Sequence, residues 1–347
     1  MKHTYRQRDY LFDNYKTLLI LLVVIGHFIE PCFSGNKILT PLKWGIVSFH
    51  MPAFIFISGY FSKRELPIKD LIRKLFVPYL VYEIVYYLFY TYIIHKKTGL
   101  YLCYPKFSLW YLLALFVWRV VTPYVKKIPH HFLLSLAAGL AIGCSEMADN
   151  FLSIPRILVF YPFFLAGMYF KRETLSKLRT AKAKVLAISS FVLCMWFVCF
   201  GPFVKMYSVK IYYGRYNYSF LGQTIAEGIF CRMICYVIGF VLTYTLMMFI
   251  SDAKHFYSYI GTRTMGIYLF HGLVYNLVKD RTHLLDSVNT AEESFLLICG
   301  CVGLSFLFSL SPFTAFTNKI ADLRLPKRLP TPSYLYYPHS LVYLEKI

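Results

Sequence analysis

An ionisable side chain interrupts the first long apolar segment of the chain. His27 follows the run Leu-Leu-Val-Val-Ile-Gly at residues 21–26. A histidine inside a membrane span is costly to place and usually faces the protein interior or a wet cavity, so it is a candidate functional residue. Neutral imidazole can take a proton from a hydroxyl as a general base, or attack a carbonyl itself as a nucleophile. The sequence leaves both roles open, and a hydrogen-bonded structural histidine is the third interpretation.

Two charged residues precede His27 on the same predicted helix. Lys16 lies about three turns before His27, close to the same face and roughly 16 Å away along the axis. Asp13 comes three residues before Lys16 and could pair with it at helical spacing. This spacing predicts a cation at the membrane boundary below a proton acceptor that lies deeper. A boundary lysine that merely extends its amine toward water is the alternative.

The loop between the second and third apolar segments is strongly basic. It contains Lys69 and Arg73, one turn apart, and Lys74. Such a group could hold the phosphates of a cytoplasmic nucleotide-like cofactor. It could equally serve only to set the membrane topology.

Further polar candidates lie in later apolar segments. Tyr268 and His271 are three residues apart and share a helix face. Arg232 should need an anionic partner at membrane depth, for which Glu227 or a substrate phosphate could serve. Residues 202–225 combine aromatic and basic side chains, which suits either a glycan or lipid-linked substrate or an interfacial aromatic belt.

The composition excludes a soluble domain. Of the 347 residues, 58% are hydrophobic and only 16% are charged, against about 25% charged in soluble domains. Apolar stretches predict ten membrane helices, at 15–31, 44–62, 75–94, 107–125, 131–147, 155–170, 184–201, 226–250, 257–278 and 294–314. The short apolar and polar alternation of a β-barrel does not occur. The chain is therefore predicted to be an all-α polytopic integral membrane protein. A multi-pass transporter of a small or lipid-linked substrate is an alternative, but the paired interrupted helices typical of transporters are not found.

The distribution of charge predicts the orientation. Lys and Arg residues are more than twice as numerous in the loops on the side of the N-terminus as in the opposite loops. The positive-inside rule then places both termini in the cytoplasm of a bacterial inner or plasma membrane. The net charge of +20 indicates attraction to membrane lipids, because its basic residues are dispersed and form no nucleic-acid-binding motif. Nine cysteines show no zinc spacing, so no metal is expected. We expect one membrane domain over 1–320 and a basic, proline-containing cytoplasmic tail over 321–347.

Several short motifs occur in order along residues 10–314. They are Asp13-x-x-Lys16, Val23-Val-x-Gly-His27, Phe49-His-Met-Pro52-x-Phe-x-Phe-x-Ser58-Gly59-Tyr60, Arg73-x-x-x-x-Pro78-Tyr79, Leu109-Trp110-Tyr111-Leu112, Tyr161-Pro-Phe-Phe-x-x-Gly167, Arg232 and Gly261-Thr-Arg-Thr-x-x-Ile-Tyr268-Leu-x-His271-Gly272. Together they resemble the acyltransferase-3 family of integral membrane acyltransferases, and most of all its fucose 4-O-acetylase-like branch.

The resemblance implies an acetyl-CoA-dependent O-acetyltransferase with ten helices. Such an enzyme moves an acyl group from cytoplasmic acyl-CoA to a hydroxyl of a cell-envelope or exopolysaccharide sugar, which is free or lipid-linked. In that family an arginine upstream of the first-helix histidine works with it, and Lys16 stands in its place here, a point charge without the bidentate fork of arginine. The resemblance assigns catalysis to His27, Lys16 and Asp13, the donor phosphates to Lys16, Lys69, Arg73 and Lys74, and the acceptor to Trp110, Tyr111, Arg232, Tyr268 and His271.

The predicted orientation can be tested by labelling single cysteines introduced in two loops. Residues 63–74 should be protected from an impermeant thiol reagent in intact cells, and residues 202–225 should react with it. The reverse pattern would invert the protein and would remove the cytoplasmic donor site from the basic loop.

Overall fold

Helices make up the regular structure of the computed structural model, which describes residues 9–146 and 151–321. No strand occurs in those two ranges, so the predicted all-α class is confirmed. The helices are α1 Tyr10–Phe28, α2 Leu39–Phe61, α3 Ile68–Leu71, α4 Val77–Leu88, α5 Trp110–Val125, α6 His131–Ala141, α7 Ile154–Tyr169, α8 Arg172–Leu178, α9 Ala181–Phe200, α10 Pro202–Met206, α11 Ile225–Met247, α12 Thr264–Arg281, α13 Ala291–Phe308 and α14 Ser311–Ala321. The tail predicted for 321–347 lies outside the described residues, apart from Ala321 at the end of α14.

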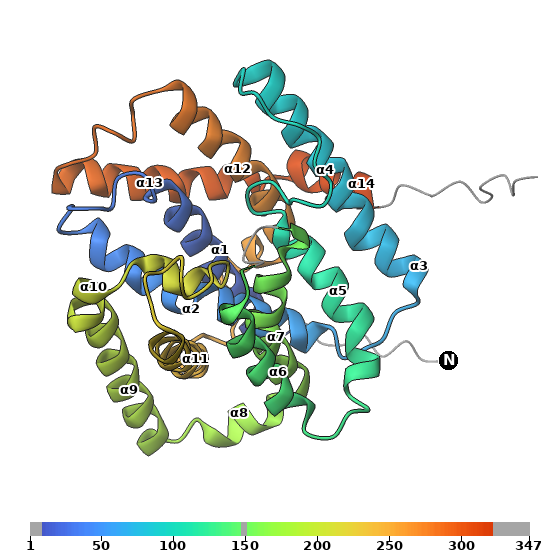
Figure 1. Ribbon diagram of the computed structural model, residues 1–347, viewed down its shortest axis with the longest axis vertical. Coiled ribbons are helices and arrows are strands. Elements are labelled where there is room, and N and C mark those ends of the chain that lie inside the picture. The colour runs from blue at the N-terminus through green and yellow to red at the C-terminus, as the bar shows by residue number, and fades with distance from the viewer. Residues whose placement is uncertain (1–8, 147–150, 322–347) are drawn as a thin grey trace, which may run out of the picture.

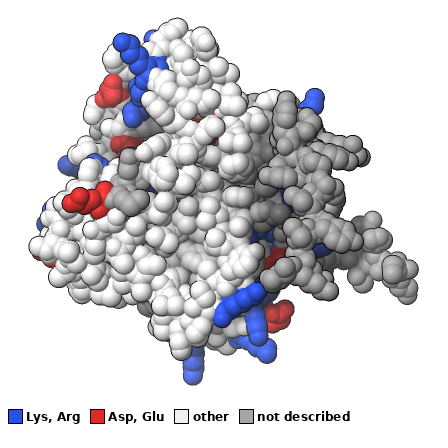
Figure 2. Space-filling model, turned by 45° about the vertical axis from the view of Figure 1, so that its right-hand side comes forward, with Lys and Arg blue, Asp and Glu red and all other residues white. Residues whose placement is uncertain are grey.

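Each of the ten predicted spans coincides with helical structure. Six of the described helices are long and apolar enough to cross a membrane: Tyr10–Phe28, Leu39–Phe61, Phe151–Tyr169, Ala181–Met206, Ile225–Met247 and Ala291–Phe308. Two others, Trp110–Val125 and His131–Cys144, are apolar but shorter. The predicted span 75–94 is α4 flanked by two π-helical turns, and the predicted span 257–278 begins with a short 3-10 turn before α12. The centre of the face seen in Figure 2 is uncharged, as a lipid-facing surface should be.

The helix that carries His27 lies at the centre of the bundle. α1 packs against α2, α12 and α13 and against the turn Ile260–Thr262 (Figure 1). Of its apolar window, 72% is buried, against 17% for Ala181–Met206. Neither helix has a pronounced polar face along its length, so the positions of the two helices follow from their neighbours. α1 is therefore a protein-enclosed helix, whereas α9 presents side chains such as Leu186 and Trp196 outward.

Two motif glycines allow α2 and α7 to touch. A Cβ atom added at Gly59 would collide with the backbone carbonyl of Phe164, and one added at Gly167 would collide with that of Phe56. Small residues permit this approach of helix backbones in membranes, where van der Waals packing drives association. The pair therefore fixes α2, which lines the site, against α7.

The Lys16 end of α1 is tied to the segment that precedes α12. The Asn14 amide donates to the carbonyls of Ser251 and Ala253, at 2.8 and 2.9 Å. The Thr17 hydroxyl lies within hydrogen-bond distance of the Tyr257 carbonyl. These bonds satisfy backbone groups of an irregular segment that has no helix of its own to supply partners.

Replacing Gly167 with alanine should destabilise the protein, because the added methyl group meets a backbone carbonyl that cannot rotate away. Overpacking of this kind costs about 1–3 kcal/mol. A lower thermal unfolding midpoint in detergent would report it.

Gly300→Ala is the matched control, since nothing lies within 4 Å of a Cβ atom built at that position in α13. Alanine is the better helix former at both positions. Equal or raised midpoints for both variants would contradict close packing of α2 on α7.

Candidate active site

His27 lies on a wall shared by two cavities. One cavity has a volume of about 100 Å³ and the other about 360 Å³. Four residues line both, and they are Val23, His27, Met51 and Trp110. The imidazole makes no hydrogen bond with a residue in the described ranges, so its nitrogens are open to molecules that enter the cavities. A catalytic group that joins two substrates needs a position of this kind.

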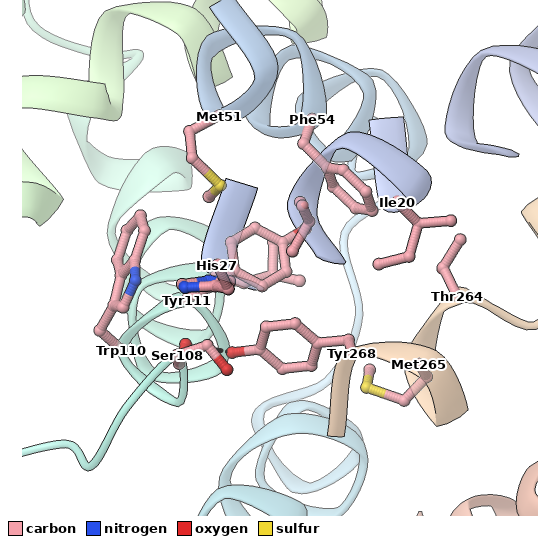
Figure 3. A pocket seen from close by; sticks show the side chains of 12 residues that line it. Ile20, His27, Met51, Phe54, Ser108, Trp110, Tyr111, Thr264, Met265 and Tyr268 are labelled. Atoms are coloured by element: carbon pink, nitrogen blue, oxygen red, sulfur yellow. Dashed lines mark hydrogen bonds between the residues drawn. The ribbon is translucent and has the colours of Figure 1, made fainter. Parts of the chain in front are cut away.

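The smaller cavity, which we call the apolar cavity, is walled by α1, α2, α5 and α12 (Figure 3). Its apolar lining includes Ile20, Phe54, Leu115 and Met265. The predicted substrate residues Trp110, Tyr111 and Tyr268 also line it, so the structure brings these three together with His27. The Tyr268 hydroxyl donates to the Ser108 carbonyl, and the Tyr111 hydroxyl shares a hydrogen bond of 2.5 Å with that of Ser58. Both phenols are therefore held in place by protein partners.

The larger cavity, which we call the polar cavity, lies at the C-terminal end of α1. Its charged lining residues are Glu30, Lys43, Arg156, Arg215 and Lys279. His50 and the phenols of Tyr212, Tyr213 and Tyr216 add polar groups. His50 bonds through Nδ1 to the Ile46 carbonyl at 2.7 Å, and because a carbonyl only accepts, Nδ1 carries the proton. Among the residues that the structure describes, the lining of the polar cavity therefore contains four cationic side chains and one carboxylate.

An ion pair between buried Lys43 and partly exposed Glu30 lines the polar cavity. Lys43 is 3% exposed, pairs with Glu30 and donates to the Gly26 carbonyl at 2.7 Å. The Tyr213 hydroxyl donates to the same carboxylate, at 2.8 and 2.7 Å from its two oxygens. Burial, and then the nearby Glu30, raises the pKa of the Tyr213 phenol, so this phenol stays protonated and keeps its role as a donor. The network fixes the last turn of α1, directly beside His27.

A second histidine lies against His27. The ring centroids of His27 and His271 are 5.3 Å apart, and Phe107 lies 4.6 Å from His27. His271 bonds through Nδ1 to the Ile267 carbonyl at 2.9 Å, and its buried Nε2 has no hydrogen-bond partner among residues 9–146 and 151–321. Phe107 has a φ of 49°, unusual for a residue other than glycine. A Cβ atom at Gly272 would collide with the Phe107 ring, which explains the glycine after His271.

The other end of α1 opens into a wide basic cavity. The predicted pair forms, with Lys16 Nζ 3.0 Å from the Asp13 carboxylate. Both residues line a cavity of about 780 Å³, which we call the basic cavity. Its other charged residues in the described ranges are four basic ones, Lys63, Arg64, Lys171 and Arg172, and two acidic ones, Asp9 and Glu173. Along α1 the structure thus places the basic cavity at Lys16, the apolar cavity from Ile20 to His27 and the polar cavity from Val23 to Glu30.

The three other predicted donor residues do not line the basic cavity. Lys69 and Lys74 are exposed, whereas Arg73 is half-buried. One terminal nitrogen of Arg73 lies 3.7 Å from Asp70, and its Nε is buried without a partner in the described part of the chain. Arg73 belongs to the π-helical turn Ile72–Phe76, just before Pro78. A proline lacks the N–H of a regular helix and clashes with the preceding turn, which accounts for the widened turn there.

Arg232 has a different environment from the one predicted. Its guanidinium donates to the carbonyls of Gly139 and Tyr216, at 3.0 and 2.9 Å, and lies over the Tyr218 ring. Its suggested partner Glu227 instead forms the capping box of α11. Arg232 therefore influences the polar cavity only indirectly, by holding the backbone of Tyr216, which lines that cavity.

Sequence reasoning missed most of the polar cavity. Glu30 and Lys43 are opposite charges at the ends of two consecutive predicted spans, and this could have suggested a pair. His50 stood within a quoted motif without an assigned role. Arg215 and three tyrosines of this cavity belong to the aromatic and basic segment 202–225, a predicted candidate for a glycan or lipid-linked substrate. No local pattern marks the convergence of Arg156 with Arg215, because their segments meet only in the folded bundle. No group of three His, Cys, Asp or Glu side chains that could hold a metal occurs in the described residues.

Comparison with known proteins assigns the family. A sequence model described as an acyltransferase domain, Acyl_transf_3, matches residues 9–310. The nodulation protein NolL of Sinorhizobium fredii is 43% identical over 58 residues, and NolL of Mesorhizobium japonicum is 45% identical over 58 residues. Each match covers 16% of this chain and 16% of the relative. No solved structure matches the chain significantly. The family model covers most of the chain, including both cavities around His27, and the protein therefore belongs to the acyltransferase-3 family.

Proposed function

We propose that this protein is a membrane O-acyltransferase that moves an acetyl group from cytoplasmic acetyl-CoA to a hydroxyl of a cell-envelope or exopolysaccharide sugar. One observation carries the proposal: His27 is shared by an apolar and a polar cavity that lie in sequence along α1. The donor reaches His27 from the Lys16 end, which faces the cytoplasm, and the acceptor reaches it through the polar cavity. Family membership favours this function over a transporter, which would have no need of a shared histidine.

In this reaction His27 acts as a general base. It takes the proton of the acceptor hydroxyl while the hydroxyl oxygen forms a bond with the thioester carbon. The carbon–sulfur bond then breaks, and the proton passes to the departing thiolate. The neutral imidazole is restored at the end of each cycle. His271 lies against the same ring and orients it.

The size of the apolar cavity favours a short acyl group. A dry engineered cavity of about 150 Å³ holds a benzene molecule, so the cavity of about 100 Å³ beside His27 suits an acetyl group. The free carboxylate of a succinyl group would place a negative charge among Ile20, Phe54 and Met265, where no described cation lines the wall. Acetyl is therefore the favoured donor group.

The donor phosphates are proposed to bind the basic residues at the Lys16 end. Lys16, Lys63 and Arg64 line the basic cavity. Arg73 has a buried Nε without a partner among the described residues, and an anion would satisfy it. Lys69 and Lys74 are exposed and contribute to the field that attracts the donor. Asp13 holds the Lys16 amine at the wall of the basic cavity.

An acyl-histidine intermediate is the rival mechanism, and it leaves a distinct trace. Direct transfer requires that the protein stay unlabelled when radiolabelled acetyl-CoA is supplied without acceptor. A label on the wild-type protein that disappears in His27→Ala would instead assign a nucleophilic role to His27.

His27→Ala should abolish transfer while acetyl-CoA binding is retained. Loss of a general base costs about 10²–10⁴ in rate, whereas the ring contributes no hydrogen bond to a described residue whose loss would unfold the protein. Transfer is measured in membrane vesicles by mass spectrometry of the polysaccharide, and binding by calorimetry in detergent. His283→Ala is the control, because that side chain is 99% exposed. Turnover above about a tenth of wild type would make His27 structural and would direct attention to His271.

Arg73→Gln should weaken acetyl-CoA binding by about tenfold or more, the usual effect of losing a charge-assisted bond to a phosphate. Lys69→Gln is the matched variant. It also removes one positive charge, but at an exposed position one turn before Arg73. We expect it to change the affinity by less than about threefold, as a screened surface charge does. Equal affinities for both variants and wild type, measured by calorimetry, would reduce the basic loop to a topology signal.

A further inference from the structure

We propose that the acceptor carries an anionic group, a phosphate or a carboxylate, which binds Arg156 and Arg215 in the polar cavity. The inference rests on the proposed function, because it names the class of sugar that His27 would deprotonate. It concerns the walls of the polar cavity and not the catalytic group.

The charges of the polar cavity do not balance. Among the described residues, its lining contains Lys43, Arg156, Arg215 and Lys279 but a single carboxylate, Glu30. That carboxylate already pairs with Lys43 and accepts from Tyr213. Arg215 and Lys279 form no ion pair with a residue in the described ranges and share the cavity with Arg156. Like charges held together at low dielectric repel each other, and an anionic ligand removes that repulsion on binding.

Arg215 is prepared for such a ligand. It forms no ion pair with a residue in the described ranges, and its Nε is buried without a hydrogen-bond partner there. Its guanidinium carbon lies 5.3 Å from the centre of the Tyr216 ring. Stacking on an aromatic face leaves the in-plane N–H donors available, and their fork matches the two oxygens of a phosphate or a carboxylate.

Arg156 connects the anion site to His27. Its guanidinium carbon lies 4.9 Å from the Trp110 ring, and its Nε lies 3.4 Å from the Tyr213 carbonyl. Trp110 also lines the apolar cavity with His27. An anion on the Arg156 guanidinium therefore sits on the wall that faces the reacting hydroxyl. The rings of Trp110, Tyr213 and Tyr216 provide flat surfaces on which a sugar ring can stack, next to the cations.

The experiment measures binding to the full-length protein in detergent, without acetyl-CoA. Three probes share one sugar ring: methyl glucoside is neutral, glucose 1-phosphate carries a phosphate, and glucuronic acid carries a carboxylate. Calorimetry at low and high salt compares them. At low salt, at least one anionic probe should bind about tenfold or more tightly than methyl glucoside, and high salt should reduce the difference. The preferred anionic probe identifies the source of the charge.

Variants then locate the binding site. Arg215→Gln and Arg156→Gln should each remove most of the preference for the anionic probe and leave methyl glucoside binding unchanged. Lys205→Gln is the control: this lysine is exposed, lies in α10 just before the same loop and does not line the polar cavity. If one arginine variant does not fold, the wild-type preference and its salt dependence still decide the question.

Three results would overturn the proposal. The first is that neither anionic probe binds more tightly than methyl glucoside, which includes the case that no probe binds up to its solubility. The second is that folded Arg215→Gln keeps the full preference for the anionic probe. The third is that Lys205→Gln loses the preference to the same extent as the arginine variants. Failure of the proposed function looks different. In that case acetyl-CoA is not consumed with any acceptor, while the anion preference, measured without acetyl-CoA, is unaffected.

Discussion

The arrangement around His27 depends on one ion pair, that of buried Lys43 with Glu30. A charged amine that is 3% exposed inside a membrane protein needs an anion and further hydrogen-bond partners. Glu30 supplies the anion, and the Gly26 carbonyl, in the last turn of α1, supplies a partner at 2.7 Å. The last carbonyls of a helix lack amide donors, and a cation is favourable there. The pair therefore joins the end of α1 to α2, and through Tyr213 it also holds the loop that carries Arg215. Its loss would release three elements of the polar cavity at once.

The central helix separates two environments that the proposed reaction must keep apart. A thioester is protected from hydrolysis where water is excluded, and the apolar cavity provides such a place. A sugar brings many hydroxyl groups, which the donors, acceptors and aromatic faces of the polar cavity can bind. His27 is the point of contact between the two. The close contacts at Gly59 and Gly167 hold α2 at a fixed distance from α7. Helix α2 supplies Met51 to both cavities, and α7 carries Arg156.

Local patterns in the sequence predicted the helices and one half of the site. Hydrophobic length alone predicted ten spans, each of which overlaps helical structure. Polar residues within apolar segments identified His27, Tyr268 and His271, the family motifs added Trp110 and Tyr111, and the fold brings these five together. The polar cavity was only partly predictable: the aromatic and basic segment 202–225, which contains Arg215, was a candidate substrate segment, whereas Lys43 and Arg156 come from separate segments and each resembles an ordinary boundary cation. For Arg232 the sequence predicted an anionic partner that the described residues do not supply. Two backbone carbonyls satisfy its guanidinium, so a buried arginine does not by itself indicate an anionic partner.

The contact between His27 and His271 connects catalysis to the choice of acceptor. Two imidazoles with centroids 5.3 Å apart, in a site that already contains Lys43 and Arg156, cannot both be protonated without strong repulsion. A neutral His27 is therefore ready to accept a proton, but the positive charge that it gains during attack is unfavourable in the same surroundings. In the proposed reaction, a negative group of the acceptor, bound to Arg156 and Arg215, would offset that charge as it develops. An anionic acceptor would in this way lower the barrier as well as bind, since an interaction that strengthens in the transition state is the kind that increases turnover.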